Sequence, residues 1–444
     1  MTTLIVGNSR TEEMVGDLTT LSPDDLVSGG CGAQRMLWYA RDGDILVLPW
    51  LPETAYLNYV TALTGTRLAT LTLVVPPPGF LGGDILTPDR LADEGFRDEL
   101  RTVLTTRRID QVLAVYTDTA IAELATVLDI EPALPGHRFS AQGGDALVNS
   151  KAAFRAMAAG TGVSIAPGTV VTRPEQAEAA INALLGQGYP VMVKQEFHGG
   201  GFGNEILATT DALRPAGAPQ VVVLPDGPAV TDYVTQRWTW LTGGRGHRLV
   251  VERYFADSVT IYAEFVITDE EIELLGVGEI LMEPVAVGEI VPAQSIDPQV
   301  RDRLVVAGRR LCEPIRGLGY RGNLSTDAIL TPEGEIVFSE TNGRITGSTH
   351  LHAVIGARVV GANHRDHRVI MERGGWQAAS FTGALEQLTA AGLAYDPATR
   401  TGIILTSCHV PADDTVVYCV VAEDLAAVRE YQRRLAALLT GVSV

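Results

Sequence analysis

The sequence predicts an α/β protein in three parts, and three observations carry this prediction. The first 140 residues alternate short, continuous apolar runs with helical stretches, as parallel sheets buried on both faces do. A glycine pair at 143–144 marks the point where this pattern changes. The chain has 444 residues, whereas one domain usually has about 100–200. We therefore expect an open α/β domain over 1–140, a central domain over 141–375 and a small α+β domain over 376–444.

Composition excludes several classes of function. Hydrophobic residues make up 46% of the chain and charged residues 20%, which is typical of a globular protein. The net charge of -19 disfavours nucleic acid as a partner, because such a chain repels phosphate backbones. No apolar stretch approaches the roughly 20 residues of a membrane helix, and the N-terminus lacks the features of a signal peptide. We expect a cytoplasmic protein whose four scattered cysteines are buried thiols.

The N-terminal elements are predicted from these apolar runs. Strands are expected over residues 4–6, 45–48, 71–75 and 112–116. Thr117, Asp118 and Thr119 provide a cap for a helix over 120–128. No G-x-G-x-x-G follows the first strand, so a dinucleotide site there has no support.

The central and C-terminal parts mix both kinds of element. Helices are expected over 151–159, ending at Gly160, and over 175–185, 297–311 and 425–438. Strands are expected over 190–194, 249–252, 259–267, 274–280, 402–406 and 416–421. The long segment between Asn204 and Leu249 is interpreted either as an insertion lining the substrate side or as a loop. It contains four basic residues, Arg237, Arg245, His247 and Arg248.

A hairpin over 325–342 carries the most informative polar residues. Its two apolar runs are joined by a turn with Pro332 and Gly334. In the simplest register Asp327 lies opposite Phe338, with Glu340 a diagonal neighbour on the same face. Asn342 continues that face, because strand side chains alternate with period two. Two carboxylates and an amide oxygen would then converge, and these are ligands that magnesium prefers.

A glycine loop and two lysines precede the hairpin. The loop over 198–204 contains Gly200, Gly201 and Gly203, and glycines let backbone N–H groups approach phosphate closely. It is not a P-loop, and alone it is weak evidence. Lys151 opens a predicted helix and Lys194 ends a predicted strand, and lysines supply positive charge to phosphates.

Together these motifs resemble the ATP-grasp family. Asp327, then Glu340 thirteen residues later, with Asn342 and Arg344, resembles the family's metal-binding end. The resemblance spans residues 151–344 and implies a two-lobed ATP-grasp fold behind a pre-ATP-grasp domain. It implies the following site residues: Lys151 and Lys194 on the phosphates, Gly200, Gly201 and Gly203 in the flap, Glu252, Arg253 and Phe255 in the adenine hinge, Asp257 in place of the usual ribose-binding acid, Asp327, Glu340 and Asn342 on Mg²⁺, and Arg344 and Arg321 in catalysis.

The arrangement of the whole chain is similar to that of peptide ligases of the pheganomycin type. This resemblance implies ATP and Mg²⁺ as cofactors and an acyl-phosphate mechanism. It also implies an amino-acid carboxylate donor, nonproteinogenic and guanidino-bearing in that family, and the N-terminal amine of a peptide as acceptor. Three alternatives remain: a ligase for small metabolites, a nucleotide-binding regulatory protein, and a carboxylase, although nothing in the sequence points to biotin or bicarbonate.

Two further features have no assigned role. Four histidines, His350, His352, His364 and His367, follow the hairpin. Without an accompanying Cys or H-E-x-x-H pattern they favour a surface or substrate-lining role over a second metal. The sequence does not determine the oligomeric state, and a homodimer is compatible with it.

Overall fold

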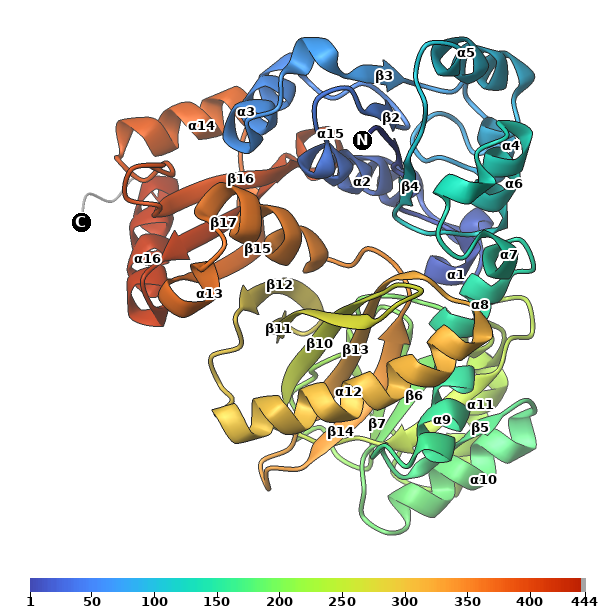
Figure 1. Cartoon of the computed structure of the whole chain (residues 1–444). Coiled ribbons are helices and arrows are strands. Elements are labelled where there is room, and N and C mark those ends of the chain that lie inside the picture. The colour runs from blue at the N-terminus through green and yellow to red at the C-terminus, as the bar shows by residue number, and fades with distance from the viewer. Residues whose placement is uncertain (441–444) are drawn as a thin grey trace.

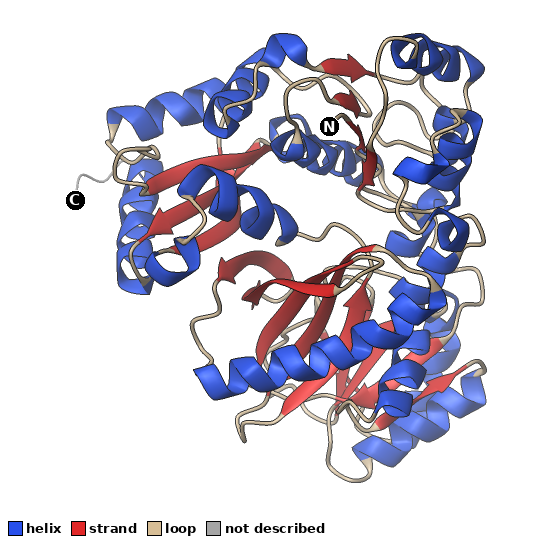
Figure 2. Cartoon of the chain, viewed as in Figure 1, coloured by secondary structure: helices blue, strands red, loops and turns tan. Residues whose placement is uncertain are grey.

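The computed structural model describes residues 1–440 and contains three β-sheets with helices packed on them (Figures 1 and 2). The strand orders are β3-β2-β1-β4, β5-β9-β6-β7-β8 and β14-β13-β10-β11-β12-β15-β17-β16. No helix in the described part of the chain is long and apolar enough to cross a membrane. All four cysteines are buried and unpaired, as predicted.

The N-terminal sheet is parallel throughout, as the continuous apolar runs predict. Leu4 pairs with Ile45 on one side and with Val112 on the other. Asp118 caps α6 by accepting a hydrogen bond from the Ile121 backbone N–H. The elements are β1 (Thr3–Val6), α1 (Glu12–Val15), η1 (Leu18–Thr20), α2 (Pro23–Ala33), η2 (Gln34–Tyr39), β2 (Ile45–Val47), α3 (Thr54–Thr64), η3 (Leu68–Thr70), β3 (Thr72–Val74), α4 (Pro88–Leu91), α5 (Glu94–Leu104), β4 (Gln111–Ala114), α6 (Thr119–Val127), η4 (Glu131–Ala133) and α7 (His137–Ser140).

The five-stranded sheet forms one lobe of the central domain. Helix α9 precedes this sheet in the chain but packs on the other central lobe through Phe154 and Ala158. It runs past Gly160, where we expected it to end, and stops at Gly162, whose φ of 64° suits a left-handed cap. The segment between Asn204 and Leu249 contains a strand and a long helix. The elements are α8 (Gly144–Asn149), α9 (Lys151–Thr161), β5 (Gly168–Val171), α10 (Pro174–Leu185), β6 (Val191–Gln195), β7 (Asn204–Ala208), β8 (Val221–Val223), α11 (Gly227–Leu241) and β9 (Leu249–Arg253).

The basic residues of that segment make structural contacts. Arg237, Arg245 and Arg248 each form an ion pair with one or more acids of their surroundings. His247 packs edge-on against Phe197. These partners do not support a substrate-lining role for the basic residues, and the strand and helix of the segment show that it is not merely a loop.

The eight-stranded antiparallel sheet joins the second central lobe to the C-terminal part. Strand β15 crosses the domain limit expected at residue 375 and pairs with β12 and β17. Helix α12 is longer than predicted because Cys312 and Ile315 in its last turns are buried. The elements are β10 (Val259–Ile267), β11 (Ile272–Met282), β12 (Ala286–Val291), α12 (Pro298–Leu318), β13 (Gly322–Leu330), β14 (Ile336–Asn342), η5 (Leu351–Val360), α13 (His364–His367), β15 (Val369–Gln377), α14 (Phe381–Ala390), β16 (Gly402–Cys408), α15 (Val410–Asp413), β17 (Thr415–Ala422) and α16 (Leu425–Thr440).

The two ends of the chain share one hydrophobic core. Trp38 Nε1 and Tyr56 Oη both donate to the carbonyl oxygen of Thr406 in β16, at 2.9 and 2.8 Å. Tyr56 also packs edge-on against Phe381 of α14, so that α3 and α14 lie side by side (Figure 1). The N-terminal domain is therefore stabilised by residues from the far end of the sequence.

A buried acid in β10 holds the loop that follows β14. Ser348 Oγ donates to Glu264 Oε2 at 2.8 Å, and the Thr349 hydroxyl donates to Glu264 Oε1. Burial raises the pKa of Glu264 to about 7, against hydrogen bonds from Thr349 and Ser348 that lower it. Because this pKa is raised on folding, the stability that Glu264 contributes is full below pH 4.5 and is lost as the pH rises through 7.

Glu264→Gln should therefore flatten part of the pH dependence of stability. From pH 5 to pH 8 the free energy of unfolding of the wild type should decrease by about 2–3 kcal/mol more than that of this variant. Urea unfolding at both pH values measures the difference. Glu270→Gln, at an exposed position just beyond the same strand, is the matched control and should follow the wild type. Parallel pH curves for wild type and Glu264→Gln would refute the assignment.

Candidate functional site

The hairpin brings two carboxylates face to face, that of Asp327 buried and that of Glu340 partly exposed. Asp327 of β13 pairs directly with Glu340 of β14, and not with Phe338 as predicted. A β-bulge between Asp327 and Ala328 causes the difference, because it leaves Ser339 without a partner residue on β13. The two acids are thus closer than the predicted diagonal pair, and both line the same cavity.

Asn342 joins this pair, but with its nitrogen. Its Nδ2 donates to Asp327 Oδ2 at 2.8 Å and to Glu340 Oε1 at 3.4 Å. The amide oxygen, which we expected to face the carboxylates, instead accepts a hydrogen bond from Arg344 Nη1. Arg344 also lies over the ring of Tyr116, with 5.4 Å from its guanidinium carbon to the ring centroid.

The two predicted lysines lie close to these acids. Lys151 Nζ is 3.2 Å from Glu340 Oε2 and donates to the His198 carbonyl oxygen at 2.5 Å. Lys194 Nζ is 2.6 Å from Glu252 Oε1. Glu252, expected at the adenine edge, is therefore the counter-ion of Lys194. Arg155, which the sequence did not single out, binds the other oxygen of Glu252 at 2.5 Å.

Opposite shifts of pKa follow from these contacts. Burial, and then the charge of Glu340, raise the pKa of Asp327 above its ordinary value. Burial also acts against ionisation of Glu340, but Lys151, Lys194 and Arg344 outweigh it and lower its pKa. One acid is thus held charged by lysines while its neighbour tends to keep a proton, as expected for like charges at short range.

An elongated cavity of 290 Å³ runs from the acids between the two lobes. Met192, Ile280 and Phe338 give it apolar walls, and the flap glycines Gly200 and Gly201 line it at one side. Both glycines have positive φ angles, 68° and 90°, which suit residues without a side chain. A cavity with apolar walls and charged groups at one end suits a flat ring that carries phosphates.

The remaining predicted nucleotide residues divide into two groups. Arg253 and Phe255 line the cavity, and Arg253 is sandwiched between the rings of Tyr189 and Phe255, at 4.1 and 4.4 Å. Gly203 and Asp257 are not among the lining residues. Gly203 packs against His198, whose Cβ would be 2.4 Å from an added Cβ, and Asp257 is exposed with a φ of 55°.

Arg321 lies away from the carboxylates, which corrects its prediction as a catalytic candidate. Its Nε is 2.7 Å from Asp269 Oδ1, and its Nη1 donates to the carbonyl oxygens of Arg316 and Tyr320. It lines a third cavity, which Arg344 also lines. Six residues of extended strand separate it from Asp327, which is about 20 Å at 3.3 Å per residue.

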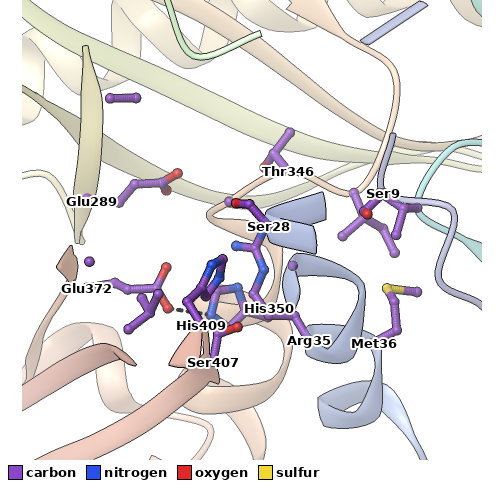
Figure 3. Close-up of a pocket in the computed structure, with 18 of the residues that line it drawn as sticks. Ser9, Ser28, Arg35, Met36, Glu289, Thr346, His350, Glu372, Ser407 and His409 are labelled. Atoms are coloured by element: carbon purple, nitrogen blue, oxygen red, sulfur yellow. Dashed lines mark hydrogen bonds and ion pairs between the residues drawn. The ribbon is translucent and has the colours of Figure 1, made fainter. Parts of the chain in front are cut away.

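A second cavity, of 530 Å³, adjoins the first beyond Arg344. Arg344, Glu289 and Thr346 line both. Figure 3 shows its interior, with Glu372 beside His350, with Arg35 of η2 and His409 close to them, and with Glu289 further away. The sequence did not predict this cavity. Glu289 and Glu372, which lie within otherwise apolar strands, were a signal that could have indicated it.

The four histidines have different surroundings. His350 Nε2 lies 2.8 Å from Glu372 Oε1 and lines the second cavity, and His352 Nε2 lies 3.1 Å from the Tyr262 hydroxyl. His364 is buried and His367 is exposed. Within residues 1–440 no group of three or more His, Cys, Asp or Glu side chains is placed to hold a metal ion.

Comparison with protein families gives three matches along the chain. Residues 33–130 match the pre-ATP-grasp domain, and residues 150–220 match the ATP-binding domain of the carbamoyl-phosphate synthase large chain. Residues 383–435 match the PGM1 C-terminal domain. A curated relative, the [butirosin acyl-carrier protein]–L-glutamate ligase of Niallia circulans, is 33% identical over 109 residues. The match covers 23% of this chain and only about a quarter, 25%, of that relative.

Solved structures resemble the whole chain in fold. An N5-carboxyaminoimidazole ribonucleotide synthetase in complex with ADP has a TM-score of 0.59 at 14% identity, covering 99% of this chain and 97% of that one. A biotin carboxylase from Campylobacter jejuni has a TM-score of 0.58 at 12% identity, covering 98% and 95%. The chain therefore shares its fold with these enzymes, and segments of its first and central parts match the pre-ATP-grasp domain and an ATP-binding domain.

Proposed function

We propose that the chain is an ATP-dependent carboxylate–amine ligase that uses Mg²⁺. One observation carries the proposal. The facing carboxylates Asp327 and Glu340, with Lys151 and Lys194 beside them, close one end of a cavity suited to a nucleotide. Arg344 stands where that cavity meets a second one large enough for further substrates. Such a layout serves transfer of a phosphoryl group from one cavity to the other.

The carboxylate pair fits a divalent cation. Burial and the charge of Glu340 raise the pKa of Asp327, so a nearby cation would relieve a repulsion that the protein only partly offsets. Asp327 and Glu340 would hold Mg²⁺, and Asn342 would join them through its oxygen after a half-turn of its amide. The ion would neutralise negative charge on the phosphate oxygens during transfer.

The chain's own residues would bind and orient the nucleotide. Lys151 and Lys194 would contact phosphate oxygens, and the flap glycines Gly200 and Gly201 would offer backbone N–H groups. The hinge after β9, with Arg253 and Phe255, would surround the base. Closure of the flap would exclude water from the reacting groups.

The proposed reaction has two steps. A substrate carboxylate attacks the γ-phosphorus of ATP, giving an acyl phosphate and ADP. An amine then attacks the acyl carbon, and phosphate leaves as the amide forms and a proton is released. Arg344, at the junction of the cavities, would stabilise the charge on the transferring phosphoryl group.

The finer part of the proposal concerns the substrates. We propose an amino-acid carboxylate as donor and the amine of a peptide as acceptor. The curated relative is, by its name, a ligase of L-glutamate to an acyl-carrier protein, which supports an amino-acid substrate. A regulatory protein with a decayed site is disfavoured by the complete set of acids, lysines and Arg344.

Glu340→Gln should lower turnover by at least about 100-fold, because the metal loses a charged ligand and the loss of about 3 kcal/mol raises the barrier. ADP release in the presence of ATP, Mg²⁺, amino acids and peptides measures the effect. Glu335→Gln, an exposed acid of the same hairpin, is the control and should retain wild-type turnover. Normal activity of Glu340→Gln would rule out the metal assignment.

Oxygen-18 in the donor carboxylate should appear in the released phosphate, because the carboxylate oxygen becomes the bridging oxygen of the acyl phosphate. A screen of donor acids and amines by mass spectrometry first identifies a productive pair, and the phosphate is then analysed for the label. Unlabelled phosphate alongside amide product would exclude an acyl-phosphate intermediate.

A further inference from the structure

The second cavity is lined by three guanidinium groups, and none of them lies within ion-pair distance of an acid among residues 1–440. Arg10, Arg35 and Arg344 all line it. Arg10 and Arg35 make no side-chain hydrogen bond or ion pair with any residue that the structure describes. The hydrogen bonds of Arg344 go to the neutral amides of Asn342 and Asn149. Burial, and then the charge of Arg35, lower the pKa of Arg10, while the charge of Asp25 acts in the opposite direction.

The acids of the same cavity do not balance these charges. Glu372 is hydrogen-bonded to His350 and to the Thr406 hydroxyl, at 2.8 and 2.6 Å. Against the effect of burial, the charges of His350 and Arg35 help to lower its pKa, so this one acid offsets only part of the positive charge. Burial, with the charges of Glu372 and Glu264, raises the pKa of Glu289 well above its ordinary value, so this carboxyl favours its neutral form. Its Oε2 is buried without a hydrogen-bond partner. The cavity is therefore positive within a chain whose net charge is -19.

The three arginines occupy positions that suit two different roles. Arg344 adjoins the nucleotide cavity and is placed to meet the carboxylate that reacts. Arg10 follows β1, and Arg35 lies on η2, so both belong to the N-terminal domain and line only the second cavity. Burial and the charge of Arg35 lower the pKa of His409 to about 4, so this neighbour is neutral and adds no positive charge at neutral pH.

We propose that the second cavity binds a substrate with two carboxylates, an acidic amino acid such as glutamate or aspartate, with Arg10 and Arg35 holding the carboxylate that does not react. This inference rests on the proposed ligase function and narrows its substrate class. An incoming carboxylate supplies the counter-charge that the guanidiniums lack, and bidentate guanidinium–carboxylate pairs are strong and directional. A guanidino-bearing donor, which the resemblance to pheganomycin-type ligases implies, would instead add another cation.

Binding to the full-length protein tests the proposal. Calorimetry with L-glutamate, L-aspartate, L-glutamine and L-arginine, in the presence of Mg²⁺ and a non-hydrolysable ATP analogue, should show at least about tenfold tighter binding of an acidic amino acid than of glutamine. In Arg35→Gln this preference should be lost, while affinity for the ATP analogue is unchanged. Arg41→Gln, an exposed arginine six residues further on, is the matched control and should keep the preference.

The outcomes are distinct. Equal binding of glutamate and glutamine, tighter binding of arginine, or no binding of any of the four would overturn the proposal, as would an unchanged preference in both Arg35→Gln and Arg10→Gln. Analogue affinity in each variant reports whether it is folded. If the wild type does not bind the ATP analogue, the ligase function itself is contradicted. The same titrations without nucleotide would still measure whether the cavity prefers acidic amino acids.

Discussion

The repulsion between Asp327 and Glu340 is the constraint around which the site is arranged. Two acids facing each other across paired strands are unfavourable unless cations lie near them. Lys151 meets one of them from the start of α9, and Lys194 adds its charge from the other lobe. The second lysine is itself held by Glu252. A chain of alternating charges thus connects the two lobes through the place where phosphates are proposed to bind.

Further contacts fix the position of the two lobes relative to each other. Ser150, which caps α9, donates to Glu196 at the end of β6, and Arg248 before β9 binds that acid through its side chain and its backbone N–H. The Gly200 carbonyl accepts from the Ala286 N–H at 3.1 Å, so the flap rests on the edge of the other lobe. Opening the flap removes few hydrogen bonds, which suits a segment that must admit and release a nucleotide.

The parts of the structure that the sequence predicted correctly depend on residues that are close together along the chain. Continuous apolar runs gave the parallel sheet, and period two placed Asp327 and Glu340 on one face. The bulge at Ser339 and the orientation of the Asn342 amide could not be predicted, because both depend on packing against other elements. Arg321 lies far from Asp327, although the two residues are close in sequence, because residues six apart on an extended strand are far apart in space. Arg155 meets Glu252, and Arg10 and Arg35 reach the second cavity, through long-range folding that no spacing in the sequence reveals.

The shared core of the two chain ends bears on how such proteins can be recombined. Trp38 and Tyr56 both find their hydrogen-bond acceptor in β16, some 350 residues further along the chain. A chimera that exchanges the first 140 residues alone would place a foreign surface against the native β16 and α14. Exchange of substrate-recognition modules between related proteins therefore requires the N-terminal and C-terminal segments to be transplanted as a pair, with the central lobes left in place.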